Sequence, residues 1–462
     1  MRAATRIRVL TSVLVLFVVA FSSASRTVAQ PASWLDAYRD TAHRLIGESM
    51  STTFAWDRLA LLGDTFGHRL SGSEALDKAI AWAAAEMKKD GLEHVRTEPV
   101  KVPHWVRGRE SLEIVEPHRS FLALLGLGNS VGTAPDGIEA DVVVLRSFAE
   151  LDAAAARVKG KIVLFNVPFT TYGETVAYRT AGPSRAAARG AVAMLVRAVG
   201  PPGLRTPHTG VLTYTTTDPK IPAAAIATED ADRLQRMQNR GTRVRLRLKM
   251  EAKFLPDAES ANVVAEIRGS ERPDEVVVVG GHFDSWDVGT GSTDDGGGCI
   301  VTWEALRLLK KLNLRPKRTV RVVLFTNEEN GLAGGRAYLE RYRSQLANHV
   351  LMLESDSGVF RPTGFGFTGS MAARSTMQQI ATLLQPIGAD QIGPSGGGAD
   401  IGPAVEAGSI PAMSLEVTGN YFLVHHTEAD TVDKIDPVDM AKAAAAIAIV
   451  AYVVADLPDR LK

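Results

Sequence analysis

A series of short apolar segments, which alternate with helical segments from about residue 261 onward, most constrains the fold of this chain. Strands that are apolar along their whole length are buried on both faces, as in a mostly parallel sheet that helices cover. We therefore predict a three-layer α/β/α sandwich. Its expected strands are 276–280, 319–326, 350–354 and 410–417, and its expected helices are 297–312, 333–346 and 436–455.

Length and charge limit the number of domains and the kinds of partner. The chain has 462 residues, which is too long for one ordinary domain. Its 52 Lys and Arg residues balance its 52 Asp and Glu residues, so the formal net charge is zero. This balance gives no sign of a nucleic-acid partner or of an anionic membrane surface as a partner.

The N-terminus has the three-part pattern of a secretory signal peptide. Arg2, Arg6 and Arg8 precede an apolar run at 9–21, and small residues at 27–29 offer a cleavage site. A membrane anchor is the alternative, but a bilayer crossing needs about 20 apolar residues. We therefore expect residues 1–29 to be removed from a secreted or periplasmic protein, which then has no membrane attachment.

The chain contains a single cysteine, Cys299, so an intrachain disulfide is impossible. Cys299 follows a glycine run at the expected start of a helix. A nucleophile is one interpretation, but a small buried residue is the better one, because free cysteine packs as a small apolar side chain.

Residues 129–253 differ from the rest of the chain. They contain short β-like runs, one Ala-rich helical stretch and many Pro and Gly turns, without a cluster of acids. A long excursion of the main domain is the alternative, although such loops are rare in compact folds. We expect a β-rich domain at 129–253, inserted into a main domain formed by 30–128 and 254–462.

Each acidic motif of the main domain begins where an expected strand ends, after the strands at 276–280, 319–326 and 350–354. Ligands of open parallel sheets bind beyond the carboxyl ends of the strands, so these motifs should meet at one edge. One isolated acid there would be better explained as a helix cap. Recurrence after three neighbouring strands instead predicts a site for hard divalent cations, which favour imidazole and carboxylate ligands. The candidate residues are His282, Asp284, Asp294, Glu328, Glu329 and Asp356, with His425 and His426 added from near the C-terminus.

Several motifs in this order resemble the two-zinc exopeptidases of the aminopeptidase and glutamate carboxypeptidase family. They are GGHFDSWDVGTGSTDDGGG, NEENG, ESDSG, FTGS and YFLVHHTEADT. The resemblance covers essentially the whole mature chain. It implies a zinc-exopeptidase sandwich with an inserted protease-associated domain, two Zn²⁺ per chain, a homodimer and hydrolysis of short peptides, in particular unblocked dipeptides. The alternatives are an aminopeptidase acting on longer peptides and a non-catalytic peptide-binding module of the same fold.

The same resemblance implies roles for individual residues. Asp294 would bridge the two ions, and Glu328 would act as the general base, which takes a proton from the attacking water and passes it to the departing amine. The sequence leaves open which ion takes Glu329 and which takes Asp356. The implied metal ligands are His282, Asp294, Glu329, Asp356 and His426.

Other residues are expected around this centre. Asp284, two residues after His282, is placed to accept the second ring N–H of that histidine and so to orient it. Tyr421 and His425 are expected to bind substrate, and the loop 395–400 is expected to line the same pocket. The family also implies a cis peptide bond between Asp294 and Asp295.

Overall fold

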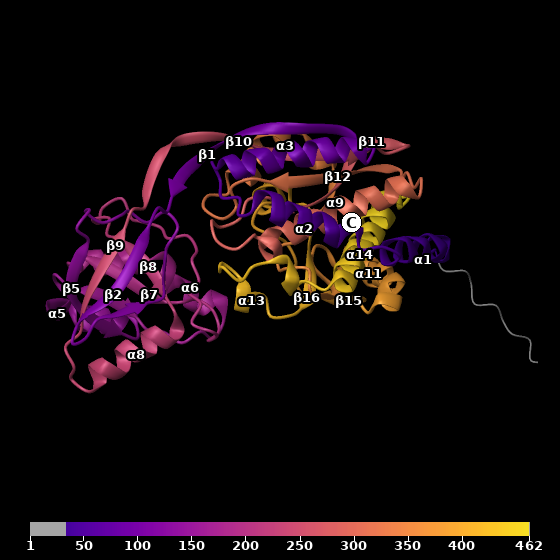
Figure 1. Cartoon of the computed structure of the whole chain (residues 1–462). Helices are drawn as coiled ribbons and strands as arrows, with labels where there is room; N and C mark the ends of the chain where they lie inside the picture. Colours follow the sequence, from indigo (N-terminus) through magenta and orange to yellow (C-terminus); the bar gives the residue numbers. More distant parts are fainter. Residues whose placement is uncertain (1–33, 462) are drawn as a thin grey trace, which may run out of the picture.

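The computed structural model describes residues 34–461, so the predicted signal peptide lies outside the described residues. The described chain forms two lobes, and each is built on an eight-stranded sheet (Figure 1). Two long antiparallel strands run from one lobe to the other. These are β1 (Glu93–Val106) and β10 (Lys253–Ile267), which pair from Glu93 opposite Glu266 to Val106 opposite Lys253.

The first sheet has the strand order β1-β10-β12-β11-β13-β16-β14-β15. Its remaining strands are β11 (Arg272–His282), β12 (Arg318–Phe325), β13 (His349–Glu354), β14 (Arg361–Thr368), β15 (Gln391–Gly393) and β16 (Ala412–Thr418). The four central strands, β12, β11, β13 and β16, are parallel to one another, whereas β10 and β14 run antiparallel to their central neighbours. All four strands predicted from the apolar runs are therefore present, and they form the parallel centre of the sheet.

Alternate residues of β11 face two different cores. Val277 and Val279 belong to a core with α9 and α14, while Val276 and Val278 belong to another with α10 and α12. Helices therefore cover both faces of the sheet. The helices of this lobe are α1 (Asp36–Met50), α2 (Phe54–Phe66), α3 (Glu74–Lys89), α9 (Gly297–Lys311), α10 (Ala333–Tyr342), α11 (Met371–Ala381), α12 (Gly402–Gly408), α13 (Tyr421–Val424) and α14 (Pro437–Asp456).

Two features of these helices follow from apolar composition. Helix α14 is long and apolar enough to cross a bilayer, but 78% of its most apolar window is buried inside the protein, as expected of a core helix. Cys299, in the first turn of α9, is fully buried, and burial raises the pKa of its thiol well above the usual value. The prediction of a small buried residue at this position is confirmed.

The second sheet has the order β3-β2-β9-β5-β6-β7-β8-β4. Its strands are β2 (Glu110–Glu116), β3 (Ser120–Leu122), β4 (Leu124–Gly126), β5 (Ile138–Leu145), β6 (Ile162–Phe165), β7 (Ala193–Arg197), β8 (Ala223–Ile226) and β9 (Arg245–Met250). Its helices are α4 (Phe148–Ala153), α5 (Ala155–Val158), α6 (Tyr172–Thr180), α7 (Gly182–Ala188) and α8 (Thr228–Asn239).

This second lobe, called the inserted lobe below (residues 110–250), begins earlier than the boundary expected at 129. Strands β2, β3 and β4 precede that boundary and pair within the second sheet. The pairing of β2 with β9 joins segments far apart in the chain. A change of composition along the sequence cannot reveal such a long-range pairing, which is why the predicted boundary was too late.

Candidate metal centre

The candidate ligands come from loops at the carboxyl ends of neighbouring parallel strands. His282 is the last residue of β11, Glu329 follows β12 and Asp356 follows β13, and β11 pairs with both other strands. Asp294 lies in the turn before α9, and His426 lies just after α13. The sheet topology therefore brings together residues that are more than a hundred positions apart in the sequence.

The five predicted ligands form two groups that share Asp294. His282 Nε2 lies 3.2 Å from Asp294 Oδ1 and 3.4 Å from Asp356 Oδ1. His426 Nε2 lies 3.2 Å from Asp294 Oδ2 and 3.2 Å from Glu329 Oε2. Ligand atoms of one tetrahedral zinc ion, bound at about 2.0–2.1 Å, lie about 3.3 Å apart. In each group the histidine nitrogen therefore lies from both carboxylates at about the spacing of ligands to one ion, and Asp294 contributes one oxygen to each group.

Unsatisfied buried oxygens also fit a pair of cations. Asp294 Oδ2 and Asp356 Oδ1 are buried and make no hydrogen bond within the described chain. A buried carboxylate oxygen without a partner is costly, and a bound cation would remove that cost. Because these residues offer nitrogen and carboxylate oxygen without thiolate, the set suits a divalent ion such as zinc.

His425 lies beside this centre. Its Nε2 is 3.5 Å from Asp294 Oδ2, and its ring stacks on that of His426 with centroids 3.5 Å apart. Asp294, His425 and His426 can also be grouped as a possible ligand set. The grouping of His426 with Asp294 and Glu329 has the shorter contacts, both at 3.2 Å, and His425 lines the cavity. Burial lowers the pKa of His425 well below its usual range, so its ring is neutral near pH 7.

The backbone around Asp294 is held by two further carboxylates. The predicted cis bond between Asp294 and Asp295 is present. Asp295 accepts hydrogen bonds from the backbone N–H groups of His282 and Gly298, each at 3.1 Å. Asp430 accepts the N–H groups of three consecutive residues that end at Asp294, at 2.6–3.1 Å. These bonds fix the position of Asp294, the residue that the two groups share.

Asp284 acts on a different partner from the one predicted. The ring nitrogen Nδ1 of His282 lies 3.9 Å from the Asp284 carboxylate but 3.0 Å from the backbone carbonyl of the same residue. The carboxylate instead accepts the backbone N–H of Glu328 at 3.1 Å, the N–H of Glu329 at 3.3 Å and the hydroxyl of Ser71 at 3.2 Å. These three donors occupy the carboxylate, so Asp284 positions the loop that carries Glu328 and Glu329.

Glu328 lies in a setting that disfavours its charge. Burial raises its pKa to about 8, and Asp356 and Asp284 add to this rise while His282 opposes it. A carboxylate that holds a proton this strongly can accept one from water near neutral pH. A bound divalent cation would lower this pKa, because positive charge favours the ionised form.

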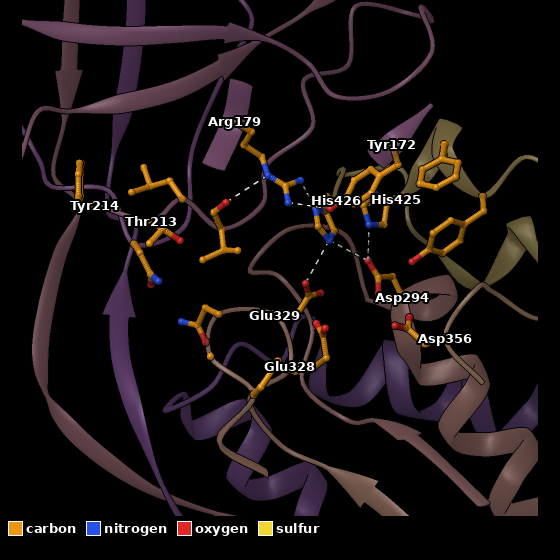
Figure 2. A pocket seen from close by; sticks show the side chains of 18 of the residues that line it. Tyr172, Arg179, Thr213, Tyr214, Asp294, Glu328, Glu329, Asp356, His425 and His426 are labelled. Atoms are coloured by element: carbon orange, nitrogen blue, oxygen red, sulfur yellow. Dashed lines mark hydrogen bonds and ion pairs between the residues drawn. The ribbon is translucent and has the colours of Figure 1, made fainter. Parts of the chain in front are cut away.

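A cavity of about 1140 Å³ opens onto the centre between the two lobes. Figure 2 shows Glu328, Glu329, Asp294 and Asp356 on one side of it, and Tyr172, Arg179, Thr213 and Tyr214 of the inserted lobe on the other. The predicted substrate residues Tyr421 and His425 both line it.

The loop 395–400 does not line this cavity, contrary to expectation, as judged from the described residues around it. It packs behind the centre instead. The N–H groups of Asp400 and Ile401 lie 3.4 and 2.9 Å from the carboxylate oxygens of Glu354, and a Cβ on Gly398 would lie 2.1 Å from that carboxylate carbon. Gly398 is therefore needed for close packing against the strand that precedes Asp356.

Comparisons with known proteins identify the family of this chain. A model of "Peptidase family M28" matches residues 262–451. Carboxypeptidase Q of Homo sapiens is 48% identical over 407 residues, which cover 88% of this chain and 86% of the relative. Carboxypeptidase Q of Xenopus laevis is 47% identical over 430 residues, which cover 92% of each chain. The chain belongs to peptidase family M28.

Solved structures extend the comparison. A peptidase M28 precursor from Shewanella amazonensis superposes with a TM-score of 0.87 at 34% identity, over 92% of this chain and 98% of the other. A zinc aminopeptidase from Bacillus subtilis gives 0.66 at 21% identity, over 88% and 98%, and shares the fold. The resemblance predicted from the motifs is thereby confirmed.

Several residues around the centre of this M28 chain were not predicted. Arg69 is fully buried and donates to the backbone carbonyls of Phe283, Thr290 and Gly291 at 2.7–3.0 Å, so it holds the loop after His282. Arg69 and Asp430 both lie in motifs that the sequence displays, HRLSGSE and HHTEADT. These motifs could therefore have identified both residues as part of the site.

Residues of the inserted lobe gave no such signal. Arg179 of α6 lies in the cavity wall and donates to the hydroxyl of Tyr172 at 2.8 Å, and its Nη1 lies 3.5 Å from the ring of His426 (Figure 2). In the sequence, neither Arg179 nor Tyr172 lies in a cluster of acids that would indicate a site.

The buried carboxyls predict how the stability of the metal-free protein depends on pH. Burial raises the pKa of Glu328 to about 8 and that of Glu354 to about 7, from 4.5. The folded state therefore binds more protons than the unfolded state, and stability falls as pH rises through these values. Burial lowers the pKa of His208 to about 4, so its opposite effect is confined to pH values below about 6.5.

We expect the melting temperature of zinc-free protein to fall between pH 7 and pH 9. Saturating zinc should make this decrease of melting temperature with pH less steep, because the cations favour ionised carboxylates. Calorimetry in chelator and in zinc would measure both slopes, and Glu328→Gln should flatten the zinc-free one. A melting temperature that rises over this range without zinc would contradict the proposed charge state.

Proposed function

We propose that this chain is a secreted metallo-exopeptidase with two zinc ions, which hydrolyses peptide bonds of short peptides, with unblocked dipeptides as the favoured substrates. One observation carries the proposal. Asp294 presents one oxygen to each of two histidine–carboxylate groups, and Glu328 lies beside them in the same cavity. The relatives named carboxypeptidase Q support peptide hydrolysis, and the inserted lobe corresponds on this view to a protease-associated domain.

Each protein group has a defined task in this proposal. When bound, the two ions supply Lewis acidity, which makes water a stronger acid and stabilises negative charge on the carbonyl oxygen of the substrate. Glu328 takes the proton of the attacking water onto its carboxylate and then donates it to the departing amine. Asp284 holds the backbone of Glu328 in place during both transfers. His425 and Tyr421, in the cavity wall, would contact the substrate.

Two residues that line the cavity each hold a buried and unsatisfied polar atom. Asn330 Nδ2 and Asn129 Oδ1 are buried and have no partner among the described residues, and both residues line the cavity. The amide of Asn330 has a fixed orientation, because its Oδ1 accepts a hydrogen bond from Asn327 at 2.6 Å. Its Nδ2 is therefore left as a donor for a carbonyl or carboxylate oxygen of the peptide.

The size of the cavity favours a second candidate, an aminopeptidase that acts on longer peptides. At about 1140 Å³ the cavity exceeds the usual range of about 300–1,000 Å³ for small-ligand sites. A non-catalytic binding module has no such observation in its favour, because the complete ligand set and the adjacent Glu328 are present together.

Glu328→Gln should lower kcat by about 100-fold to 10,000-fold, the usual contribution of a general base, while two zinc ions per chain are retained. Steady-state kinetics on dipeptides and metal analysis of the same samples would measure this. Glu406→Gln, on an exposed part of α12, is the matched control and should leave both quantities unchanged. Retained activity in Glu328→Gln would remove this residue from the mechanism.

Asn330→Asp should raise KM, because it replaces a donor by an acceptor and places another negative charge near Glu329. The expected rise is about tenfold, in line with about 1–1.5 kcal/mol for one hydrogen bond. Asn239→Asp, on the exposed end of α8, serves as the control. An unchanged KM in Asn330→Asp would show that this amide does not contact the substrate.

A comparison of kcat/KM for free dipeptides, blocked dipeptides and longer peptides would separate the two candidate specificities. A dipeptidase should lose most of its activity when either terminus is blocked or extended. Equal or higher activity on longer peptides with a free N-terminus would favour the aminopeptidase.

A further inference from the structure

The two histidines that could contact the two ions are oriented from different parts of the molecule. The Nδ1 of His282 lies 3.0 Å from the backbone carbonyl of Asp284, two residues further along the same loop. The Nδ1 of His426 lies 3.2 Å from the backbone carbonyl of Thr209, which belongs to the inserted lobe. One half of the centre is therefore completed within its own lobe, and the other half depends on the second lobe.

The contact between the lobes at His426 is a set of three hydrogen bonds. Besides the bond from His426 Nδ1, the N–H of Thr209 donates to the carbonyl of His426 at 3.0 Å. The ring of His208 donates through Nδ1 to the carbonyl of His425 at 2.8 Å. All four residues are buried, so the bonds are shielded from water.

These bonds determine which ring nitrogen of His426 faces the other ligands. The carbonyl of Thr209 only accepts, so it requires Nδ1 of His426 to carry the proton. Nε2 is then free of a proton and faces Asp294 and Glu329. Arg179 Nη1 lies 3.5 Å from the same Nδ1, but both are donors, and Arg179 instead donates to the Thr209 carbonyl at 3.4 Å.

Thr209 is in turn held by a buried ion pair at the junction of the lobes. Its hydroxyl donates to the carbonyl of Gly126 at 2.6 Å and accepts from Arg107 Nη2 at 3.3 Å. Arg107 directly follows β1 and binds both oxygens of Asp287, at 2.9 and 2.5 Å. Asp287 lies in the loop that begins at His282. The contacts therefore run from the His282 loop through Arg107 and Thr209 to His426.

We propose that Arg107, Asp287 and Thr209 are positioning residues for His426, through which the inserted lobe completes one of the two metal sites. The inference rests on the proposed two-ion centre. It assigns a role to Asp287, an acid of the first motif that contacts neither ligand group. It also predicts that the two ions differ, since only the ion held by His426 and Glu329 would depend on the inserted lobe.

Thr209→Val tests this claim, because it removes the hydroxyl and keeps the shape of the side chain and the backbone carbonyl. Titration of zinc against a chromophoric chelator resolves the affinities of the two ions. Because the orienting carbonyl is less firmly held rather than lost, we expect one of the two affinities to weaken by up to about 10-fold, the lower end of the effect of losing such a partner, and the other to stay unchanged. Asp287→Asn should have the same effect, and Thr209→Ser should restore wild-type affinity.

Ligand variants identify the affected ion. His426→Ala removes a ligand of one site and His282→Ala removes a ligand of the other. Adding Thr209→Val to His426→Ala should cause no further loss of zinc affinity, whereas adding it to His282→Ala should weaken the ion that remains. This difference separates a positioning role from a general loss of stability, which would act in both backgrounds.

The control is the nearby ion pair of Arg109 and Glu251, which is exposed and in which Nε and Nη2 of the arginine lie 3.1 and 2.9 Å from Oε1 of the glutamate. Arg109→Lys should leave both zinc affinities unchanged. Equal weakening of both ions by Thr209→Val, or no weakening at all, would overturn the inference. A wild-type protein that binds fewer than two ions would instead contradict the proposed centre itself, and the inference with it.

Discussion

Repulsion between buried carboxylates is the constraint on which the rest of this structure depends. Three parallel strands end side by side, and each delivers acids to the same small volume. Burial and the neighbouring acids raise the pKa of Glu328, Glu329 and Asp356. Such a cluster is tolerable only if protons, N–H donors or cations compensate it.

The buried acids are compensated in different ways at different positions in the chain. Asp430 and Asp284 are bound by backbone N–H groups, which stabilise carboxylates without adding a charged side chain. The carboxylates of Asp294 and Asp356 retain unsatisfied oxygens that face histidine nitrogens. The acids therefore divide into those that build the loops and those that remain available for ions.

The parallel strands and the meeting point of the candidate ligands could be predicted from the sequence, because each depends on a short, local sequence pattern. The apolar runs identified the parallel strands, and the strand ends identified where His282, Glu329 and Asp356 would meet. The role of Asp284 could not be predicted, because it depends on whether its carboxylate or its backbone carbonyl faces the ring of His282. Thr209 and Arg179 could not be found either, since their distance from His426 is set by how two lobes pack, which no local pattern records.

The lone cysteine at the start of α9 has a consequence for how the folded protein responds to oxidants. Thiol–disulfide exchange proceeds through the thiolate and requires access to it. Cys299 is fully buried, and its thiol holds its proton more tightly than a free cysteine does. The chain therefore carries no accessible sulfhydryl among its described residues, so oxidants should not crosslink one molecule to another while it stays folded.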